Sequence, residues 1–226
     1  MSRFALPGSG RYVATLRDWL DDEPALSGAT WLTTRPLVPR LQALGLRVST
    51  VEPFIMGEPD VDGLAALWQA LPLKDGCPLV AVGGGTVLDT AKFLSVMSEP
   101  RPEGLWQEPP GSRRCPVWAV PGTPGTGSEW TSVAVAGFPV EGVKRGLASP
   151  WMIPERAVLV PELLEDLPDR VFASAHADAL VHALEAWLSP QGNPFSEGLA
   201  REAVRLLHGA WLRTVARRGV QAWRQE

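Results

Sequence analysis

Asp178 and His182 lie four residues apart in the segment HADALVHALEAW, residues 176–187. On a helix this spacing places both side chains on one face, where a carboxylate and an imidazole could bind one metal ion. Such a pair suits Fe²⁺ or Zn²⁺ and leaves coordination positions open for a substrate. The alternative is structural, because an acidic residue near a helix N-terminus stabilises the helix dipole whatever the histidine does. Taken alone, the spacing favours that structural alternative.

The other two histidines are predicted not to be ligands. His176 precedes Asp178 by two residues, would face away from the pair and is expected to be a helix-start residue. His208 lies in the next helical pattern and is expected on the protein surface.

A glycine-rich segment follows an apolar run in PLVAVGGGTVLDTAK, residues 78–92. The run predicts a buried strand that ends at the glycines, and Thr86 opens a helix. Glycines let backbone N–H groups approach an anion, and the helix dipole adds a favourable field. We predict a pyrophosphate site, although the segment matches neither G-x-G-x-x-G nor a Walker sequence. The alternative is a tight turn, followed at helical spacing by Asp89 and Lys92 on a solvated face.

A second glycine-rich segment, PGTPGTGSE at residues 121–129, follows another apolar run. Thr123, Thr126 and Ser128 offer hydroxyl groups, and the glycines keep the backbone accessible. Ligands bind at the carboxyl ends of strands in open α/β sheets, which favours a binding loop over a flexible surface loop.

The elements that position these segments follow from hydrophobic periodicity. The predicted strands are 30–33, 46–51, 79–82, 117–120 and 157–160, and the predicted helices among them are 38–44 and 61–71. Strands separated by helices imply an α/β layer with a parallel sheet.

After Pro161 the pattern becomes helical, over 170–188 and 195–217, with the loop 189–194 between them. We therefore predict two domains, an α/β nucleotide-binding domain over 1–162 and the start of a helical metal and substrate domain over 163–226. Two helices bury too little surface to form a domain alone. They must pack on the α/β part, join another chain, or be the start of something missing.

Composition excludes several classes of protein. The chain has 226 residues and a net charge of −4 with both signs interspersed, which argues against a nucleic-acid surface. The first residues carry no signal-peptide pattern, and no apolar stretch is long enough to span a bilayer. Cys77 and Cys115 fit neither a disulfide framework nor metal-ligand spacing, so a cytoplasmic location is expected.

Together and in this order, these segments resemble the iron-containing alcohol dehydrogenase family. That family carries GGGS-x-x-D-x-x-K, PTT-x-GTGSE, and G-x-DAL-x-H-A-x-E followed by an NP loop. The corresponding segments here are GGGTVLDTAK, PGTPGTGSE, HADALVHALE and GNPFSEGLA. The resemblance covers essentially the whole chain and is weakest before residue 50. It implies a Rossmann-like parallel-sheet domain followed by a partial all-helical domain, the dehydroquinate synthase-like architecture, and association as a homodimer.

The resemblance also implies an activity, the transfer of a hydride between NAD or NADP and a small alcohol or aldehyde, assisted by a divalent metal such as Fe²⁺ or Zn²⁺. It makes Asp178 and His182 metal ligands. The cofactor-binding residues that it implies are Gly84, Gly85, Thr86, Asp89, Thr123, Thr126, Thr131 and Lys144.

The sequence departs from the family pattern at several positions. The family's serine, the first threonine of PTT, the aspartate of a DP pair and a glycine before the ligand helix are replaced here by Thr86, Gly122, Val160 and His176. The acidic residue that would bind the adenosine 2′-hydroxyl after the first strand is absent, and Thr33, Thr34 and Arg35 stand there instead. Arg35 therefore predicts a preference for the 2′-phosphate of NADP(H).

The family's metal site uses one aspartate and three histidines, and no histidine follows His208. The metal site is therefore expected to be incomplete, as in a fragment of a longer enzyme or a shortened member. Two alternatives stay open: a catalytically impaired nucleotide-binding fragment or pseudoenzyme, and a relative of glycerol dehydrogenase or dehydroquinate synthase. An uncovered helical edge would leave apolar surface exposed, which predicts association or poor solubility.

Overall fold

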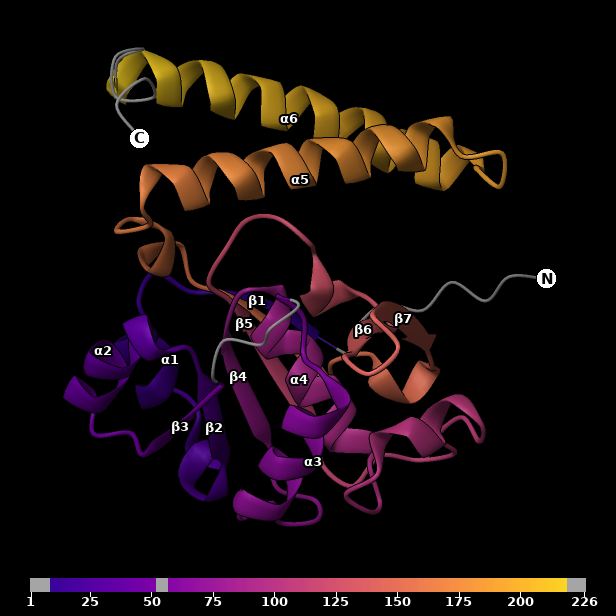
Figure 1. The fold of residues 1–226 in the computed structure, drawn as a ribbon. Coiled ribbons are helices and arrows are strands. Elements are labelled where there is room, and N and C mark those ends of the chain that lie inside the picture. The colour runs from indigo at the N-terminus through magenta and orange to yellow at the C-terminus, as the bar shows by residue number, and fades with distance from the viewer. Residues whose placement is uncertain (1–8, 52–56, 219–226) are drawn as a thin grey trace. The chain divides into compact units, whose positions relative to one another are not determined.

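The computed structural model describes residues 9–51 and 57–218, and its contacts divide into two compact units (Figure 1). The first unit comprises the described residues up to Gly122 together with Ser128–Glu162. The second comprises Thr123–Gly127 and the described residues from Leu163 onward. The second glycine-rich loop thus leaves the first unit after Gly122 and returns to it at Ser128.

The first unit is built on a six-stranded sheet in which every neighbouring pair is parallel. Its order is β1-β8-β5-β4-β2-β3. The strands are β1 (Ser9–Tyr12), β2 (Thr30–Thr33), β3 (Val48–Thr50), β4 (Leu79–Gly83), β5 (Val117–Pro121) and β8 (Arg156–Leu159). The predicted α/β fold with a parallel sheet is confirmed, and each of the five predicted strands is present.

Helices connect the strands in sequence. They are α1 (Leu16–Asp21), α2 (Val38–Ala43), α3 (Val61–Ala70) and α4 (Gly85–Val96). Short 3₁₀ segments lie between the larger elements: η1 (Pro24–Gly28), η2 (Arg35–Leu37), η3 (Pro102–Trp106), η4 (Ser128–Trp130), η5 (Pro150–Met152) and η6 (Pro161–Leu164).

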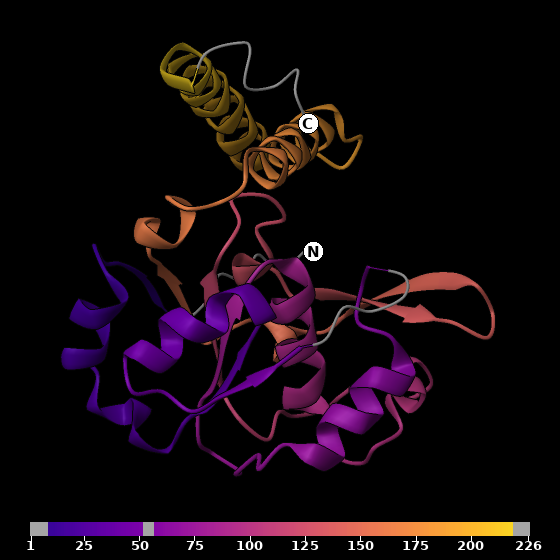
Figure 2. The same cartoon turned by 60° about the vertical axis from the view of Figure 1, so that its left-hand side comes forward.

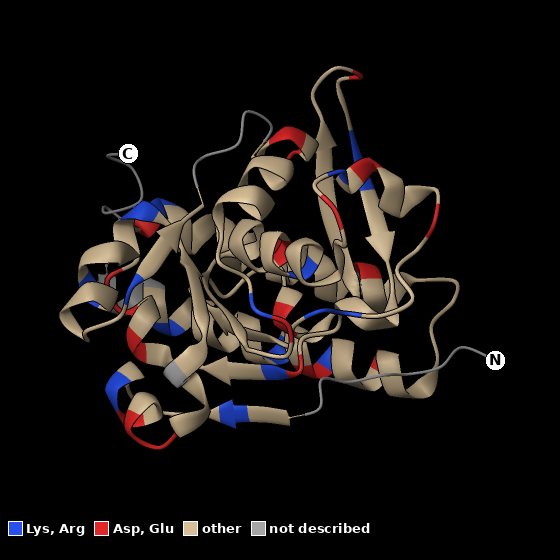
Figure 3. Ribbon diagram, turned by 90° about the horizontal axis from the view of Figure 1, so that it is seen from below, with Lys and Arg blue, Asp and Glu red and all other residues tan. Residues whose placement is uncertain are grey.

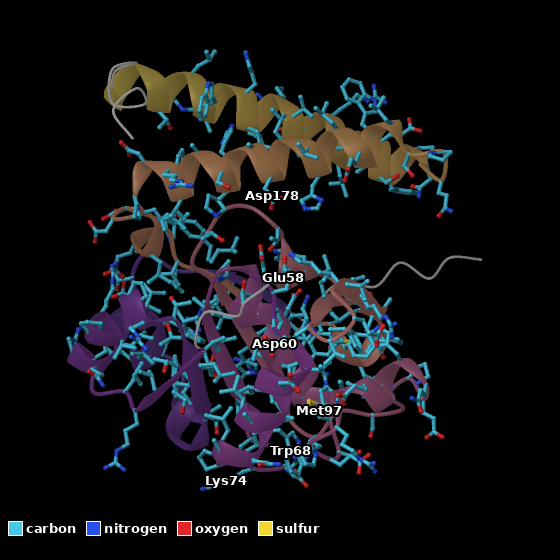
Figure 4. The ribbon with its side chains drawn as sticks, in the orientation of Figure 1. Glu58, Asp60, Trp68, Lys74, Met97 and Asp178 are labelled. Atoms are coloured by element: carbon cyan, nitrogen blue, oxygen red, sulfur yellow. The ribbon has the colours of Figure 1, made fainter. Side chains whose placement is uncertain are left out.

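Alternating residues of the strands bury both faces of the sheet, because side chains point to opposite faces in turn. On one face, Leu32 and Ala81 join a core cluster with residues of α3 and α4. On the other, Trp19 of α1 packs its ring against Trp31 and Trp118, with centroid distances of 6.0 and 6.3 Å. The side-chain view (Figure 4) includes Trp68 of α3, whose Nε1 donates to the carbonyl of Met97 just after α4.

The direction of strand addition reverses between β2 and β4. From β2 the chain adds β3 on one side, and then passes through α3 to β4 on the other side of β2. In open parallel sheets, ligands bind at the carboxyl ends of the strands at such a reversal. Here those ends are Thr33 and Gly83, and Gly83 is where the first glycine-rich segment begins.

A two-stranded antiparallel sheet, β6 (Val133–Phe138) with β7 (Val143–Ala148), completes the first unit. Figure 2 shows it as a ribbon that extends to one side of the parallel sheet. Neither this hairpin nor β1 was predicted. β7 is exposed along most of its length and β1 is short and polar, so neither has the apolar alternation that marks a strand.

The second unit contains the helical pair α5 (Asp169–Leu188) and α6 (Pro194–Arg218), which lie side by side (Figures 1 and 2). Asn193 caps α6, because its side-chain oxygen accepts hydrogen bonds from the backbone N–H groups of Phe195 and Ser196. Both helices were predicted from the sequence. The described residues from Leu163 onward belong to this unit together with Thr123–Gly127, and the predicted domain boundary after residue 162 stays a prediction.

Charges are spread along the chain. In Figure 3, Lys and Arg positions alternate with Asp and Glu positions along the ribbon and do not gather on one element. Within the described residues, no helix is both long and apolar enough to cross a membrane.

Candidate functional site: two glycine-rich turns and a carboxylate–imidazole pair

The first glycine-rich segment is a sharp turn from β4 into α4. β4 ends at Gly83, Gly84 is the N-cap residue with φ −75° and ψ −175°, and α4 begins at Gly85, one residue before the predicted start at Thr86. No side chain caps this helix. The backbone N–H groups of its first turn therefore lie at the carboxyl end of a central strand, which is the arrangement that binds phosphate groups.

Close packing at this turn leaves no space for side chains. A β-carbon at Gly83 would lie 2.8 Å from Cγ2 of Val87, and one at Gly122 would lie 3.1 Å from Cα of Gly83. The N–H of Gly122 donates to the carbonyl of Gly83 at 2.8 Å. The ends of β4 and β5 are thus held together, and the second glycine-rich loop starts beside the first.

Thr86 and Lys144 both contact the short segment before α3. The hydroxyl of Thr86 donates to the carbonyl of Gly57 at 3.0 Å, and Nζ of Lys144 on β7 lies 3.6 Å from Oε1 of Glu58, which is labelled in Figure 4. Two of the predicted cofactor-binding residues, far apart in the sequence, are thereby brought to one segment of the first unit.

Asp89 and Lys92 are buried, so the alternative of a solvated face is wrong. Asp89 is 8% exposed and Lys92 is fully buried. One carboxylate oxygen of Asp89 accepts from Oγ of Ser128 at 2.5 Å, and the other accepts from the N–H of Val135 at 3.0 Å. Nζ of Lys92 donates to Oγ of Ser128 at 2.6 Å.

The remaining donors of Lys92 also have partners. Its ammonium group donates to the hydroxyl of Thr131 at 3.0 Å and to the carbonyl of Val133 at 2.8 Å. An ammonium group has three donors, so its hydrogen-bonding capacity is filled. Thr131, predicted to contact the cofactor, is thus a partner of a buried lysine.

Burial sets the electrostatics of this group of residues. It lowers the pKa of Lys92 to about 8, against the opposing effect of Asp89, whose carboxylate lies 3.6 Å away. Burial also raises the pKa of Glu129, while the charge of Lys92 acts in the opposite direction.

Arg35 lies beside the reversal of strand order. It begins η2 directly after the carboxyl end of β2 and is exposed to solvent. Thr33, at that strand end, is buried and its hydroxyl donates to the carbonyl of Val82.

In the second unit, the loop Thr123–Gly127 lies against α5. A β-carbon at Gly125 would lie 3.1 Å from Oδ2 of Asp178 and 3.3 Å from Cα of Ala175. Loop and helix line an open cleft of about 400 Å³. Its lining residues are Thr123, Gly125, Thr126, Arg170, Val171, Ser174, Ala175 and Asp178.

Asp178 and His182 share one face of α5, as their spacing requires. Nε2 of His182 lies 3.5 Å from Oδ1 of Asp178, and the two side chains are 55% and 43% exposed, respectively. Within the part of the chain that the structure describes, no group of three His, Cys, Asp or Glu side chains is placed to hold a metal ion. The donor chemistry suits a divalent cation, but the number of donors is smaller than a stable site needs.

The expectation that His176 lies at a helix start is wrong. α5 begins at Asp169, so His176 lies in its second turn, and it is buried with its ring 6.1 Å from that of Phe172 and 5.1 Å from that of Trp211. The residue is a packing contact between α5 and α6. His208 is exposed, as expected.

Arg170 is a residue of the cleft that the sequence analysis missed. It lies on the first turn of α5, and Arg170, Ser174 and Asp178 follow one another at intervals of four. That helical spacing was visible in the sequence and would have placed all three on one face.

A family model described as "Iron-containing alcohol dehydrogenase" matches residues 27–161. The 4-hydroxybutyrate dehydrogenase of Clostridium kluyveri is 34% identical over 165 residues, which are 73% of this chain and 44% of that protein. The probable alcohol dehydrogenase EutG of Escherichia coli is 36% identical over 163 residues, 70% of this chain and 41% of that one. The chain thus spans less than half the length of these curated relatives.

Solved structures with the same fold include an iron-containing alcohol dehydrogenase of Thermotoga maritima. It matches with a TM-score of 0.77 and 25% identity, over 95% of this chain and 63% of that one. A sulfoacetaldehyde reductase of Bifidobacterium kashiwanohense, solved in complex with NAD⁺, has the same TM-score and identity, over 92% of this chain and 58% of its own.

Proposed function

This chain belongs to the iron-containing alcohol dehydrogenase family. From that premise we propose that it binds NAD or NADP and acts as an alcohol dehydrogenase or aldehyde reductase. The observation that carries the proposal is the turn at Gly83–Gly84–Gly85, which begins α4 at the reversal of strand order. The proposed substrate is a small alcohol or aldehyde.

The residues present fit a dinucleotide. The uncapped first turn of α4 offers N–H groups to a pyrophosphate, and the glycines at 83 and 122 leave no side chain in the way. We assign the pyrophosphate to Gly84, Gly85 and Thr86, and the remaining cofactor contacts to Thr123, Thr126, Thr131 and Lys144. Asp89 supports these contacts from within the protein, because both of its carboxylate oxygens already accept hydrogen bonds.

The metal is a separate proposal. Asp178 and His182 would supply two ligands to Fe²⁺ or Zn²⁺, and two protein donors alone hold such an ion weakly. When bound, nicotinamide donates or accepts the hydride and the divalent cation acts as a Lewis acid. Nucleotide binding is expected to be better preserved than turnover.

Titration with NADH, followed by fluorescence, tests the nucleotide site. Thr86→Glu places a carboxylate where the pyrophosphate would bind, so affinity should be lost. The variant should nevertheless melt close to the wild type, because the favourable interaction of an acidic residue with the helix dipole offsets the lost hydrogen bond from Thr86 to Gly57. Equal affinity in the two proteins would reject the assignment of the pyrophosphate to this turn.

Cofactor preference is tested by titrating NADPH beside NADH. Arg35 is exposed at the carboxyl end of β2 and would pair with a 2′-phosphate. We expect tighter binding of NADPH in the wild type, and loss of that preference in Arg35→Ala. A large preference of the wild type for NADH would reject the proposal.

Metal content, measured by elemental analysis, separates the enzyme from the alternative of a catalytically impaired nucleotide-binding fragment. Near-stoichiometric iron or zinc that is lost in Asp178→Ala and His182→Ala would indicate a site completed by water, substrate or another chain. Absence of metal from all three proteins would favour the impaired fragment, an alternative supported by the two-donor site.

Sedimentation of the same samples tests the proposed homodimer. The two free cysteines accord with the proposed cytoplasmic location.

A further inference from the structure

Lys92 is the one fully buried charged side chain among the described residues, and no part of the proposed chemistry requires it. It lies on α4, the helix whose first turn is assigned to the pyrophosphate. A buried ammonium group is costly unless its charge and its donors are compensated. The three acceptors around Lys92 supply that compensation, and all of them lie in Ser128–Val133, where the chain has returned to the first unit after Thr123–Gly127.

Ser128 is the central partner. Its hydroxyl accepts from Lys92 at 2.6 Å and donates to Asp89 at 2.5 Å, so one residue is held by both charged groups of α4. Ser128 is also the first residue of the first unit after the loop Thr123–Gly127. At the other end of the loop, Gly122 donates to Gly83 at 2.8 Å. One end of the loop is therefore held by the end of β4 and the other by two residues of α4.

We propose that Lys92 is a positioning residue, which through Ser128 fixes the return point of the Thr123–Gly127 loop and thereby sets the affinity for the dinucleotide. This inference rests on the proposed function, since it assumes that Thr131 and the first turn of α4, both in the first unit, bind one cofactor. Lys92 does not itself touch the cofactor. Its ammonium group holds Ser128, Thr131 and Val133 against α4.

The proposal implies that affinity depends on the proton of Lys92. The groups that face this ammonium are Asp89 on α4, Glu129 and Ser128 on η4, and Thr131. Burial lowers the pKa of Lys92 to about 8, so the proton is lost under mildly alkaline conditions. A neutral amine has two donors in place of three, and it leaves the buried carboxylate of Asp89 without a cation.

The test measures NADH affinity from pH 6.5 to pH 9.5 in the wild type and in Lys92→Met, Ser128→Ala and Lys74→Met. Lys74→Met is the matched control, because the same substitution is made at an exposed lysine (labelled in Figure 4). We expect the Kd of the wild type and of the control to rise as the pH passes 8. The Kd of Lys92→Met should be about tenfold higher at neutral pH, as for loss of one hydrogen bond to a charged group, and independent of pH.

Ser128→Ala keeps the test decisive if Lys92→Met fails to fold, since it removes one hydroxyl and leaves the charges in place. Its Kd should also rise about tenfold at neutral pH. Wild-type affinity in a folded Ser128→Ala protein, or in a folded Lys92→Met protein with the pH dependence intact, would overturn the inference.

Hydrogen exchange without any ligand separates failure of this inference from failure of the proposed function. The amide of Val135, which donates to Asp89, and the amides of residues 122–131 should exchange faster in Lys92→Met than in the Lys74→Met control. Equal exchange would overturn the positioning role even if the wild type binds NADH. Failure of the wild type to bind NADH would overturn the proposed function, and the affinity part of this inference with it.

Discussion

Gly83, the last residue of β4, lies so close to Val87 on the first turn of α4 that a β-carbon at Gly83 would be 2.8 Å from Cγ2 and 3.0 Å from Cβ of Val87. The end of β4 and the first turn of α4 therefore pack together with no room for a side chain at Gly83. The glycine is required here for space, because no positive φ angle is recorded at this position.

Gly83→Ala is therefore expected to destabilise the first unit by about 1–3 kcal/mol, the usual cost of forcing an extra carbon into a packed site. Val87→Ala removes Cγ2, the nearest clashing atom, and keeps Cβ, so the double variant should recover part of the loss. Chemical denaturation of the single and double variants measures this coupling. Gly104→Ala is the control, since a β-carbon there would meet nothing within 4 Å. Equal stability of Gly83→Ala and Gly104→Ala would contradict the packing argument.

The buried charge of Lys92 predicts how stability changes at alkaline pH. Its pKa is lowered to about 8 in the folded chain from 10.5, so between these values the unfolded chain binds more protons. The free energy of unfolding of the wild type should therefore rise relative to that of Lys92→Met between pH 8 and 10.5, by up to about 3 kcal/mol. Urea denaturation across this range checks the sign.

Burial raises the pKa of Cys115, so this thiol lowers the free energy of unfolding as the pH rises. Both proteins carry Cys115, so its contribution cancels when the wild type is compared with Lys92→Met. A gap between the two proteins that stays constant over this pH range would show that Lys92 is not titrating as a buried group. Affinity for NADH is expected to fall over the same range, so stability and binding should move in opposite directions.

The two cysteines should differ in reactivity. Cys115 is buried, and burial raises its pKa to about 11, whereas Cys77 is partly exposed. Since the thiolate is the reactive form, iodoacetamide at pH 8 should label Cys77 well before Cys115 in the folded chain. Peptide mass spectrometry after timed labelling measures both rates. In urea the difference should disappear, and labelling of Cys115 at the rate of Cys77 without denaturant would contradict its burial.

His176 predicts acid sensitivity of the helical pair. Burial between Phe172 and Trp211 lowers the pKa of His176, so the unfolded chain takes up this proton first as the pH falls. The stabilising contribution is complete above the ordinary histidine pKa of about 6.5 and is lost as the pH drops below it. The protection factors of the amides in α5, which correct for the slower intrinsic exchange in acid, should therefore fall between pH 7 and 5. His176→Phe should remove this fall, and an unchanged acid response in that variant would assign it to other groups.

The strands and the two glycine-rich turns were predictable because their signals are local. A buried parallel strand is a continuous apolar run, and glycines mark the place where the backbone turns into a helix, so β4 and the start of α4 could be located to within one residue. β7 was missed because it is mostly exposed and has no apolar alternation. β6 is an apolar run, so its signal was present in the sequence and was overlooked. β1 was missed because its four residues pair with β8, which lies far along the sequence.

The sequence by itself determined the family motifs, the helical spacing that puts Asp178 and His182 on one face, and the positions of the glycines. These depend on residue type and on the repeat of a single element. The tertiary structure alone decided that Asp89 and Lys92 are buried, because their burial depends on Ser128, which follows 36 and more residues later. It also decided that His176 packs against Trp211 on another helix. A charged or aromatic residue has no fixed burial of its own, since the free energy of burying it depends on partners that only the folded chain brings together.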